Sequence, residues 1–169
     1  MKRLFIMCGI AFSGKTTVAK KLVEHLGCAY ISLDDINAER GLHGGEGVPI
    51  EEWQRTHDIA RERMRGIMAR GEDIVLDDTS CFRWLRKGYS EFARHSGYTS
   101  ELVYLEVSLD EAKGRIARNS KTPTRPPIDR QVFEAHIQDF QFPRADELPT
   151  VLRSDDEVLI WLESKRRSS

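Results

Sequence analysis

The chain has 169 residues, enough for one domain with a sizeable apolar core. Hydrophobic residues make up 40% of the sequence and charged residues 31%, a balance typical of a globular protein and not of a disordered one. The 26 basic and 27 acidic residues give a formal net charge of −1, so no overall positive field indicates a nucleic-acid-binding protein.

Cysteine content and hydropathy bear on location. The three cysteines lack metal-binding spacing, which is typical of free thiols in a reducing compartment. No apolar run approaches the roughly 20 residues of a membrane-spanning helix, so we expect no membrane partner. The start, "MKRLFIMCGIAFS", has features of a signal peptide, but cleavage there would remove a glycine-lysine turn described below. We therefore expect a cytoplasmic protein.

Strands and helices alternate along the chain. The apolar run "RLFIM" before Gly9 is typical of a strand that is buried on both faces of a sheet. The spacing of Val18, Leu22 and Leu26 then predicts a helix that Gly27 closes. Further strands are expected at 29–32, 72–78, 101–107 and 150–152, and further helices at 35–40, from Ile50, at 83–95, after a Ser108–Glu111 capping box, from near Asp129, and at 155–165.

This alternation predicts an α/β fold in which one domain spans residues 1–169. We expect a mainly parallel sheet of about five strands with helices on both faces. The first three strands end in "CG", "SLDD" and "LDD". Because ligands of such sheets bind at the carboxyl ends of the strands, polar chemistry should gather at that edge. The glycine-rich stretch "GLHGGEGVP" predicts a mobile loop.

The turn after the first strand matches G-x-x-x-x-G-K-[ST], a phosphate-binding motif, or P-loop. Glycines let the backbone N–H groups face inward, and the helix N-terminus adds partial positive charge. In such a loop Lys15 reaches the β- and γ-phosphates and the Thr16 hydroxyl ligates Mg²⁺. We therefore expect nucleotide to bind through Gly9, Ala11, Phe12, Ser13, Gly14, Lys15, Thr16 and Thr17.

Aspartates end two further strands. Either Asp77 or Asp78 would hold the metal through its water shell, and an ordinary polar strand end is the alternative. Asp34 and Asp35 favour phosphoryl transfer, because a kinase needs a carboxylate that accepts the proton of the acceptor hydroxyl. A second possible role for Asp34 is to cap the helix over 35–40.

The motifs together resemble those of a known group of enzymes. "GIAFSGKTT", "YISLDDINAER", "VLDDTS", "RIARNSK" and "PPID" are similar, in order and spacing, to the kinase domain of phage polynucleotide kinase. They also resemble the small P-loop kinases around it, which include zeta-toxin-like and chloramphenicol-phosphotransferase-like enzymes. The similarity spans roughly residues 1–140. Many families share the P-loop, whereas the other motifs in combination are more specific.

The resemblance implies a P-loop NTPase fold with a helical lid over about 113–130, and it implies ATP as the phosphoryl donor. It implies that Asp34 is the general base and that Asp78 lies beside the acceptor or the metal's water shell. It also implies that Arg118 closes over the nucleotide with the lid.

Two positions depart from the pattern of polynucleotide kinase. Asn37 stands where that enzyme has an arginine that helps to engage the acceptor, and Thr122 stands where its lid has a second arginine. Arg125 is a candidate to replace the latter. Both departures bear on a nucleic-acid acceptor more than on kinase activity. The basic residues of the lid, any of which could equally belong to a solvated helix face, are Lys113, Arg115, Arg118, Lys121, Arg125 and Arg130.

The acceptor is expected to be small and not a nucleic acid. The stretch "ERGLHGGEGVPIEEW" carries four glutamates against Arg40 alone, and such a rim would repel a polyanion. Trp53 and His57 fit a core face but would also border an acceptor pocket. His136 shows no recognisable functional spacing.

The sequence thus predicts an ATP- and Mg²⁺-dependent kinase that phosphorylates a hydroxyl of a small molecule, such as an antibiotic, a sugar or a nucleoside. A polynucleotide 5′-hydroxyl kinase is the second candidate. A nucleotide-dependent switch or binding module with slow hydrolysis is the third. The expected catalytic residues are Asp34, Lys15, Arg118 and Arg125, and the residues expected at the acceptor are Asp34, Asp35, Asp78 and Trp53.

Overall fold

A computed structural model of the chain describes residues 2–42 and 48–166. Its five strands form one sheet in the order β2-β3-β1-β4-β5, and each neighbouring pair is parallel. The apolar first strand lies at the centre of the sheet, as predicted. The strands are β1 (Arg3–Cys8), β2 (Ala29–Ser32), β3 (Ile74–Asp77), β4 (Thr99–Leu105) and β5 (Thr150–Leu152).

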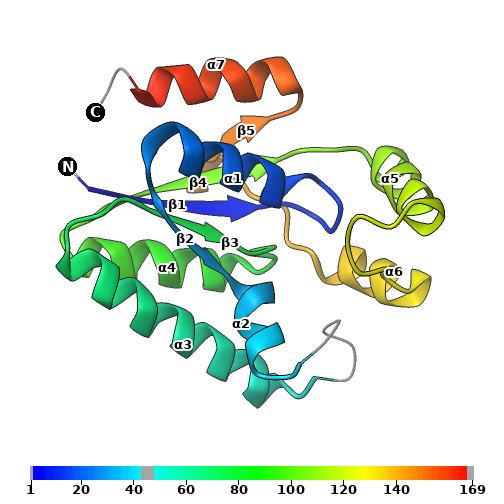
Figure 1. Cartoon of the computed structure of the whole chain (residues 1–169), viewed down its shortest axis with the longest axis horizontal. Coiled ribbons are helices and arrows are strands. Elements are labelled where there is room, and N and C mark those ends of the chain that lie inside the picture. The colour runs from blue at the N-terminus through cyan, green and yellow to red at the C-terminus, as the bar shows by residue number, and fades with distance from the viewer. Residues whose placement is uncertain (1, 43–47, 167–169) are drawn as a thin grey trace.

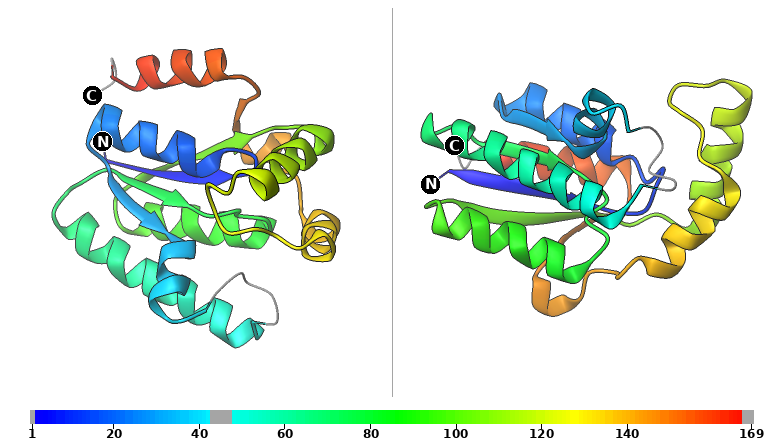
Figure 2. Two further views of the ribbon diagram at one scale, coloured as in Figure 1. Left: turned by 45° about the vertical axis from the view of Figure 1, so that its right-hand side comes forward. Right: turned by 90° about the horizontal axis from the view of Figure 1, so that it is seen from below.

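Helices cover both faces of the sheet, and two further helices extend beyond the carboxyl ends of the strands (Figures 1 and 2). The first layer contains α1 (Lys15–Leu26) and α7 (Asp155–Arg166), and the second contains α2 (Leu33–Glu39), α3 (Ile50–Ala69) and α4 (Arg83–His95). The projecting pair is α5 (Leu109–Lys121) and α6 (Arg130–Asp139), and a short 3₁₀ turn, η1 (Ala145–Glu147), precedes β5. The predicted α/β architecture is confirmed.

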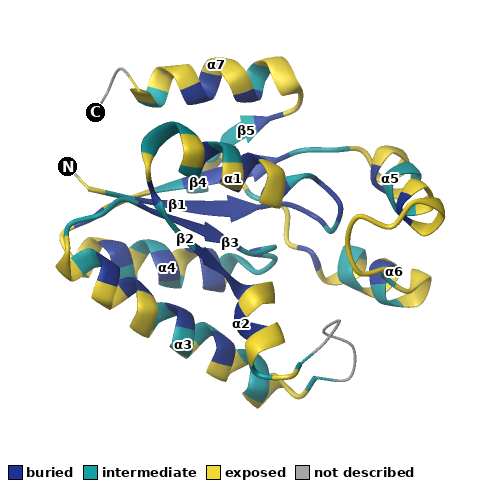
Figure 3. Cartoon of the chain, viewed as in Figure 1, coloured by how far each residue is buried: buried dark blue, intermediate teal, exposed yellow. Residues whose placement is uncertain are grey.

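The central strand separates two apolar cores. Phe5 and Met7 pack toward α1 and α7, whereas Leu4 and Ile6 pack toward α3 and α4. All four side chains are fully buried, and exposed residues are concentrated on the outer helix faces (Figure 3). Because both faces of the sheet are covered, a ligand can reach the strands only at their ends.

Local caps set where the helices begin at this edge. The Ser32 hydroxyl accepts a hydrogen bond from the backbone N–H of Asp35 at 3.1 Å and caps α2. The suggested capping role of Asp34 is therefore wrong, because Ser32 already fills that position. Ser108 accepts a hydrogen bond from the Glu111 N–H, which is the predicted start of α5. The predicted glycine-rich loop falls largely on residues 43–47, which lie outside the described residues.

A buried arginine on α4 joins the loop that follows β3 to the chain that follows α6. The Arg86 guanidinium is 2% exposed and donates to both carboxylate oxygens of Glu147 at 2.6 and 2.9 Å. It also donates to the backbone oxygens of Ser80 at 2.9 Å and Gln141 at 2.8 Å. The loop after β3 and the chain that leads from α6 to η1 are thereby tied to α4.

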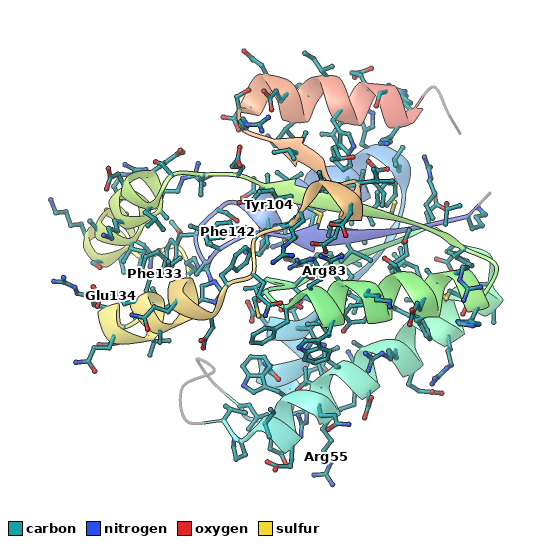
Figure 4. All side chains as sticks on the ribbon, turned by 180° about the vertical axis from the view of Figure 1, so that it is seen from behind. Arg55, Arg83, Tyr104, Phe133, Glu134 and Phe142 are labelled. Atoms are coloured by element: carbon teal, nitrogen blue, oxygen red, sulfur yellow. The ribbon has the colours of Figure 1, made fainter. Side chains whose placement is uncertain are left out.

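We expect Arg86→Leu to lower the free energy of unfolding by about 3 kcal/mol, because Glu147 would lose its buried partner. Arg83→Leu is a matched control. The neighbouring Arg83–Asp146 ion pair is exposed, with side-chain exposures of 41% and 60%, and should contribute less than about 1 kcal/mol. Figure 4 shows Arg83 at the start of α4 beside the chain that carries Phe142. Urea unfolding measures both variants, and equal losses would contradict this account.

Candidate functional site

The P-loop curls at the carboxyl end of β1. The Gly9 N–H donates to the Thr79 carbonyl at 3.2 Å, which ties the loop to the segment after β3. A Cβ on Gly9 would lie only 2.6 Å from Ser13 Oγ, so a larger residue there would displace the loop. Gly14 has a φ of 97°, a left-handed conformation that glycine adopts without strain. Both motif glycines are therefore required by local geometry.

The loop wraps around the ammonium group of Lys15. This buried side chain donates from Nζ to the Ile10 carbonyl at 2.9 Å and to Ser13 Oγ at 3.4 Å. Burial lowers the pKa of Lys15, while the charges of Asp77 and Asp78 act in the opposite direction. An anion that entered the loop would give this ammonium a charged partner in place of two neutral oxygens.

Helix α1 presents an open N-terminus to the same space. Its N-cap, Gly14, has no side chain, and no acidic residue lies in the first turn. Thr16 and Thr17 are exposed at this end of the helix. The first N–H groups of a helix lack partners within it, and they carry partial positive charge. The arrangement fits a phosphate group.

A cavity of about 750 Å³ opens beside the loop, a volume typical of small-molecule sites. It lies between α1, α5 and the start of α7. Apolar side chains and arginines line it together. Among the lining residues are Phe12, Thr17, Leu105, Val107, Arg115, Arg118, Arg125 and Val158.

Arginines from α5 and the turn after it contact the P-loop directly. Arg115 donates to the Phe12 carbonyl at 3.0 Å, and the Arg125 guanidinium lies 4.2 Å from the centre of the Phe12 ring. The buried amide of Asn119 holds the turn that carries Arg125, since its oxygen accepts hydrogen bonds from the backbone N–H groups of Thr124 at 2.9 Å and Arg125 at 3.2 Å. The sequence had not distinguished Arg115 from the other basic residues of this segment.

The two aspartates after β3 lie in different surroundings. Val75 packs in the core beside α1 and Leu76 in the core beside α3, so strand alternation turns Asp77 toward the α1 layer. Asp77 is buried and accepts a hydrogen bond from the Tyr30 hydroxyl at 2.7 Å. Asp78 is half-buried and accepts one from the Ser80 N–H at 3.0 Å.

Asp34 lies at the same edge, in the first turn of α2, and like Asp35 it is exposed, although neighbouring atoms displace part of its water. Its pKa is raised, first by partial desolvation and then by the negative charges of Asp78 and Asp77, while Arg125 and Lys15 act against the rise. The structure therefore brings together Asp34, Asp77, Asp78 and Lys15. Asp35 is exposed and adds its charge to the surroundings of the Tyr30 hydroxyl on β2.

The structure also places Asn37, which departs from the polynucleotide kinase pattern, and Trp53, which was expected at the acceptor. Asn37 is buried, and its side-chain oxygen accepts a hydrogen bond from the Thr56 hydroxyl at 2.5 Å, which ties α2 to α3. Trp53 is half-buried on α3, one turn before His57. The His57 Nδ1 atom lies 2.6 Å from the Tyr89 hydroxyl oxygen.

The expected acidic rim is largely neutralised within the described residues. Glu39 forms an ion pair with Arg63, and Glu52 forms one with Arg40. The expectation that Arg40 alone balances these acids is wrong, because α3 brings Arg63 back beside α2 from 24 residues along the chain. Charge repulsion at this rim is therefore a weak argument about the acceptor.

A metal at this edge would need waters or substrate phosphates as ligands in addition to protein side chains. Within residues 2–42 and 48–166, no three His, Cys, Asp or Glu side chains gather as a group that could hold a metal ion. Mg²⁺ commonly uses one or two protein ligands with waters and substrate phosphates, so the hydroxyl of Thr16 and the carboxylates of Asp77 and Asp78 fit that chemistry. In the same part of the chain, no helix is both long enough and apolar enough to cross a membrane.

One contact was not predicted. The backbone N–H of Ala11, in the middle of the P-loop, donates to Nε2 of His136 on α6 at 3.2 Å. The two residues are 125 positions apart, so no spacing in the sequence could have indicated the pair.

Comparison with known proteins agrees with this geometry. Residues 4–143 match the family described as AAA domain. Over 131 residues the chain is 24% identical to a shikimate kinase of Francisella tularensis subsp. holarctica. The matched region covers 72% of this chain and 67% of that protein. A second relative, "Putative adenylate kinase" of Pyrococcus furiosus, is 36% identical over 66 residues, or 38% of this chain. This match spans only a third of the length of that relative.

Solved structures share the fold at low identity. A gluconokinase from Sinorhizobium meliloti superposes with a TM-score of 0.72 at 18% identity, covering 97% of this chain and 93% of that one. The Mycobacterium tuberculosis APS kinase CysC, solved in complex with AMPPNP and APS, gives 0.71 at 14% identity, with 99% and 98% covered. The P-loop, the sheet order and these structural neighbours all indicate a P-loop kinase fold. The narrower resemblance to phage polynucleotide kinase stays a prediction. The chain belongs to the AAA domain family and is a kinase-like P-loop NTPase.

Proposed function

We propose that this protein transfers the γ-phosphoryl group of Mg·ATP to a hydroxyl of a small molecule. The observation that carries the proposal is the placement of the Asp34 carboxyl at the same sheet edge as Lys15, Asp77 and Asp78. A protein that only binds or slowly hydrolyses nucleotide needs a phosphate loop and a metal-binding group. A separate carboxylate beside them suits an acceptor hydroxyl.

The P-loop would hold the phosphates, and its buried lysine would change partners on binding. Lys15 would leave the Ile10 carbonyl and Ser13 Oγ for the β- and γ-phosphates. Mg²⁺, when bound, would neutralise charge on those phosphates, and Thr16 and Asp77 would hold it. Asp77 is the better candidate of the two aspartates, because it is turned toward the α1 layer, where Thr16 lies in the first turn of the helix.

Asp34 would act as the general base, with Asp78 beside it. A raised pKa makes a carboxylate a stronger base, and the nearby charges of Asp78 and Asp77 contribute to that rise. An acceptor hydroxyl could then bind between Asp34 and the phosphates, with Trp53 at the border of the site. Asp35, whose N–H serves the α2 cap, would have at most a supporting role.

The nucleoside would occupy the cavity beside α5, and residues 113–130 would form the lid. Arg115 and Arg125 already contact the P-loop residue Phe12, so only a short movement would bring their guanidinium groups onto the phosphates. Arg118 lines the same cavity. Guanidinium groups placed there would offset the negative charge that develops during transfer.

A small acceptor is supported by the relatives and not by the charge of the rim. Shikimate kinase and gluconokinase are both named for small hydroxyl compounds. The buried Asn37 also argues against a polynucleotide, because its side chain is bonded to Thr56 where the resembling enzyme has an acceptor-side arginine.

Lys15→Ala is expected to reduce phosphoryl transfer by at least ~100-fold, the scale of removing one preorganised electrostatic group. The melting temperature should change little, because the variant removes a buried ammonium whose hydrogen-bond partners are both neutral. Lys20→Ala, on the exposed side of the same helix, serves as the control. Near-normal transfer by the Lys15 variant would refute the phosphate-clamp role.

Asp77→Asn and Asp78→Asn should separate the metal from the acceptor. The Asp77 variant should need at least ~10-fold more Mg²⁺ for half-maximal rate, a loss typical of disturbed metal ligation. The Asp78 variant should keep the Mg²⁺ requirement and instead raise the KM of the acceptor. Steady-state rates across a Mg²⁺ series measure both requirements. If the Asp78 variant alone needed more Mg²⁺, Asp78 and not Asp77 would be the metal-binding residue.

Asp34→Asn should abolish transfer and leave ATP affinity within a few-fold, since an amide keeps the size but accepts no proton. The wild-type rate should fall as the pH decreases, because a protonated Asp34 cannot act as a base. Since the Asp34 pKa is raised, the midpoint of this fall should lie above the ordinary aspartate pKa of about 3.9. Asp35→Asn is the comparison variant. Loss of transfer in that variant alone would move the base to Asp35.

The acceptor class is tested with labelled ATP. One arm offers small polyols, sugars, nucleosides and aminoglycosides, and the other offers 5′-hydroxyl oligonucleotides at increasing salt. We expect label in a small compound. Efficient labelling of oligonucleotide ends that weakens steeply with salt would identify a polynucleotide kinase instead. ATP turnover that no acceptor stimulates would favour a nucleotide-dependent switch.

A further inference from the structure

His136 lies on the inner face of α6, a projecting helix that two buried phenylalanines connect to the core of the protein. Phe133 and Phe140 lie three residues before and four residues after it, and both are buried in the main core. The His136 ring packs edge-on against Phe140, with 5.7 Å between ring centres. The Gln141 N–H, just beyond, donates to the Cys81 carbonyl at 2.9 Å. The imidazole is therefore held in place at the mouth of the P-loop.

The hydrogen bond to the P-loop fixes the protonation of this ring. A backbone N–H only donates, so Nε2 of His136 accepts from Ala11 and the ring is the neutral form with its proton on Nδ1. The charged groups that act on the ring are Lys15 in the loop, Asp78 after β3 and Asp139 on α6 itself. Burial, with help from Lys15, lowers the pKa of His136 to about 4.

A bound nucleotide would compete for this bond. N–H groups of a P-loop point at phosphate oxygens, and a phosphate oxygen accepts as Nε2 does. Once a phosphate oxygen takes the Ala11 N–H, two acceptors would face each other at close range. The contact is relieved if the ring swings away or if Nε2 takes up a proton. The anchoring of α6 by Phe133 and Phe140 favours the second outcome.

We propose that His136 is a binding residue for the terminal phosphate of the nucleotide: it closes the empty P-loop as a neutral acceptor and holds the phosphate as a protonated donor. This inference rests on the proposed binding of ATP at the P-loop and adds to it a residue outside the motif. The proton comes from solvent, one N–H bond forms, and no other bond changes.

Proton uptake sets the direction of the pH effect. The bound form has the higher pKa, so affinity for a nucleotide with a γ-phosphate should increase as the pH falls through that value. A phosphate group within hydrogen-bond distance favours the protonated imidazole, so it raises the pKa of His136 above its value in the empty protein. ADP lacks the γ-phosphate and should show little of this effect.

Isothermal titration calorimetry in MES and in imidazole, at about pH 6, measures the protons taken up when Mg·AMPPNP binds. We expect the wild type to take up more protons on binding than His136→Gln does. Glutamine keeps an acceptor for the Ala11 N–H but does not protonate. His95→Gln, on the exposed end of α4, is the control and should match the wild type. Mg·ADP should give no such difference.

Nitrogen NMR of the wild-type His136 ring provides a second readout that needs no variant. The ring should change from the Nδ1–H form to the doubly protonated form on addition of Mg·AMPPNP. Equal proton uptake by wild type and His136→Gln, or a ring that stays neutral, would overturn the inference while leaving nucleotide binding intact. Failure of the wild type to bind Mg·AMPPNP would instead refute the proposed function.

Discussion

The buried ammonium of Lys15 is the constraint on which the rest of the site depends. A cation without an anionic partner is costly in a protein interior, and this one is stabilised by the Ile10 carbonyl, the Ser13 hydroxyl and the more distant charges of Asp77 and Asp78. The loop must curl tightly to supply those oxygens, and that requires glycine at position 9, where a Cβ would collide with Ser13. A charged phosphate is the ligand that best completes such a site.

The sheet separates the roles of the acidic residues around this cation. Its order, β2-β3-β1-β4-β5, places the ends of β2 and β3 on one side of the P-loop and the cavity by α5 on the other. Strand alternation turns Asp77 toward the α1 layer, while the largest effect of any charge on the pKa of Asp34 comes from Asp78. In the proposed function, metal binding and proton transfer would therefore use different carboxylates, although the two aspartates after β3 are adjacent in sequence. Arg86 supports this arrangement by fixing the loop through Ser80.

Much of the fold was predictable, because its signals are local. Apolar runs marked the strands, and the Ser108 cap and the terminal Gly27 marked helix ends. The P-loop motif and the strand-end aspartates indicated the edge of the sheet where the candidate site lies. Contacts between distant segments were not predictable. The ion pair of Glu39 with Arg63 and the bond from Ala11 to His136 join residues that only the tertiary fold brings together. The spacing of residues in the sequence cannot reveal such pairs. The rim of the acceptor side therefore appeared more acidic in the sequence than it is in the structure.

A structure of the protein with Mg²⁺, ADP and aluminium fluoride, which together mimic the transferring phosphoryl group, tests the central claim most directly. The account predicts that the aluminium fluoride lies at the P-loop within reach of Lys15. It also predicts that the metal is held by Thr16 and Asp77. The Asp34 carboxylate should face the apical position opposite the leaving oxygen, within about 3 Å of the ligand there. A metal ligated by Asp34 itself, or an Asp34 side chain turned away from the apical position, would contradict the account.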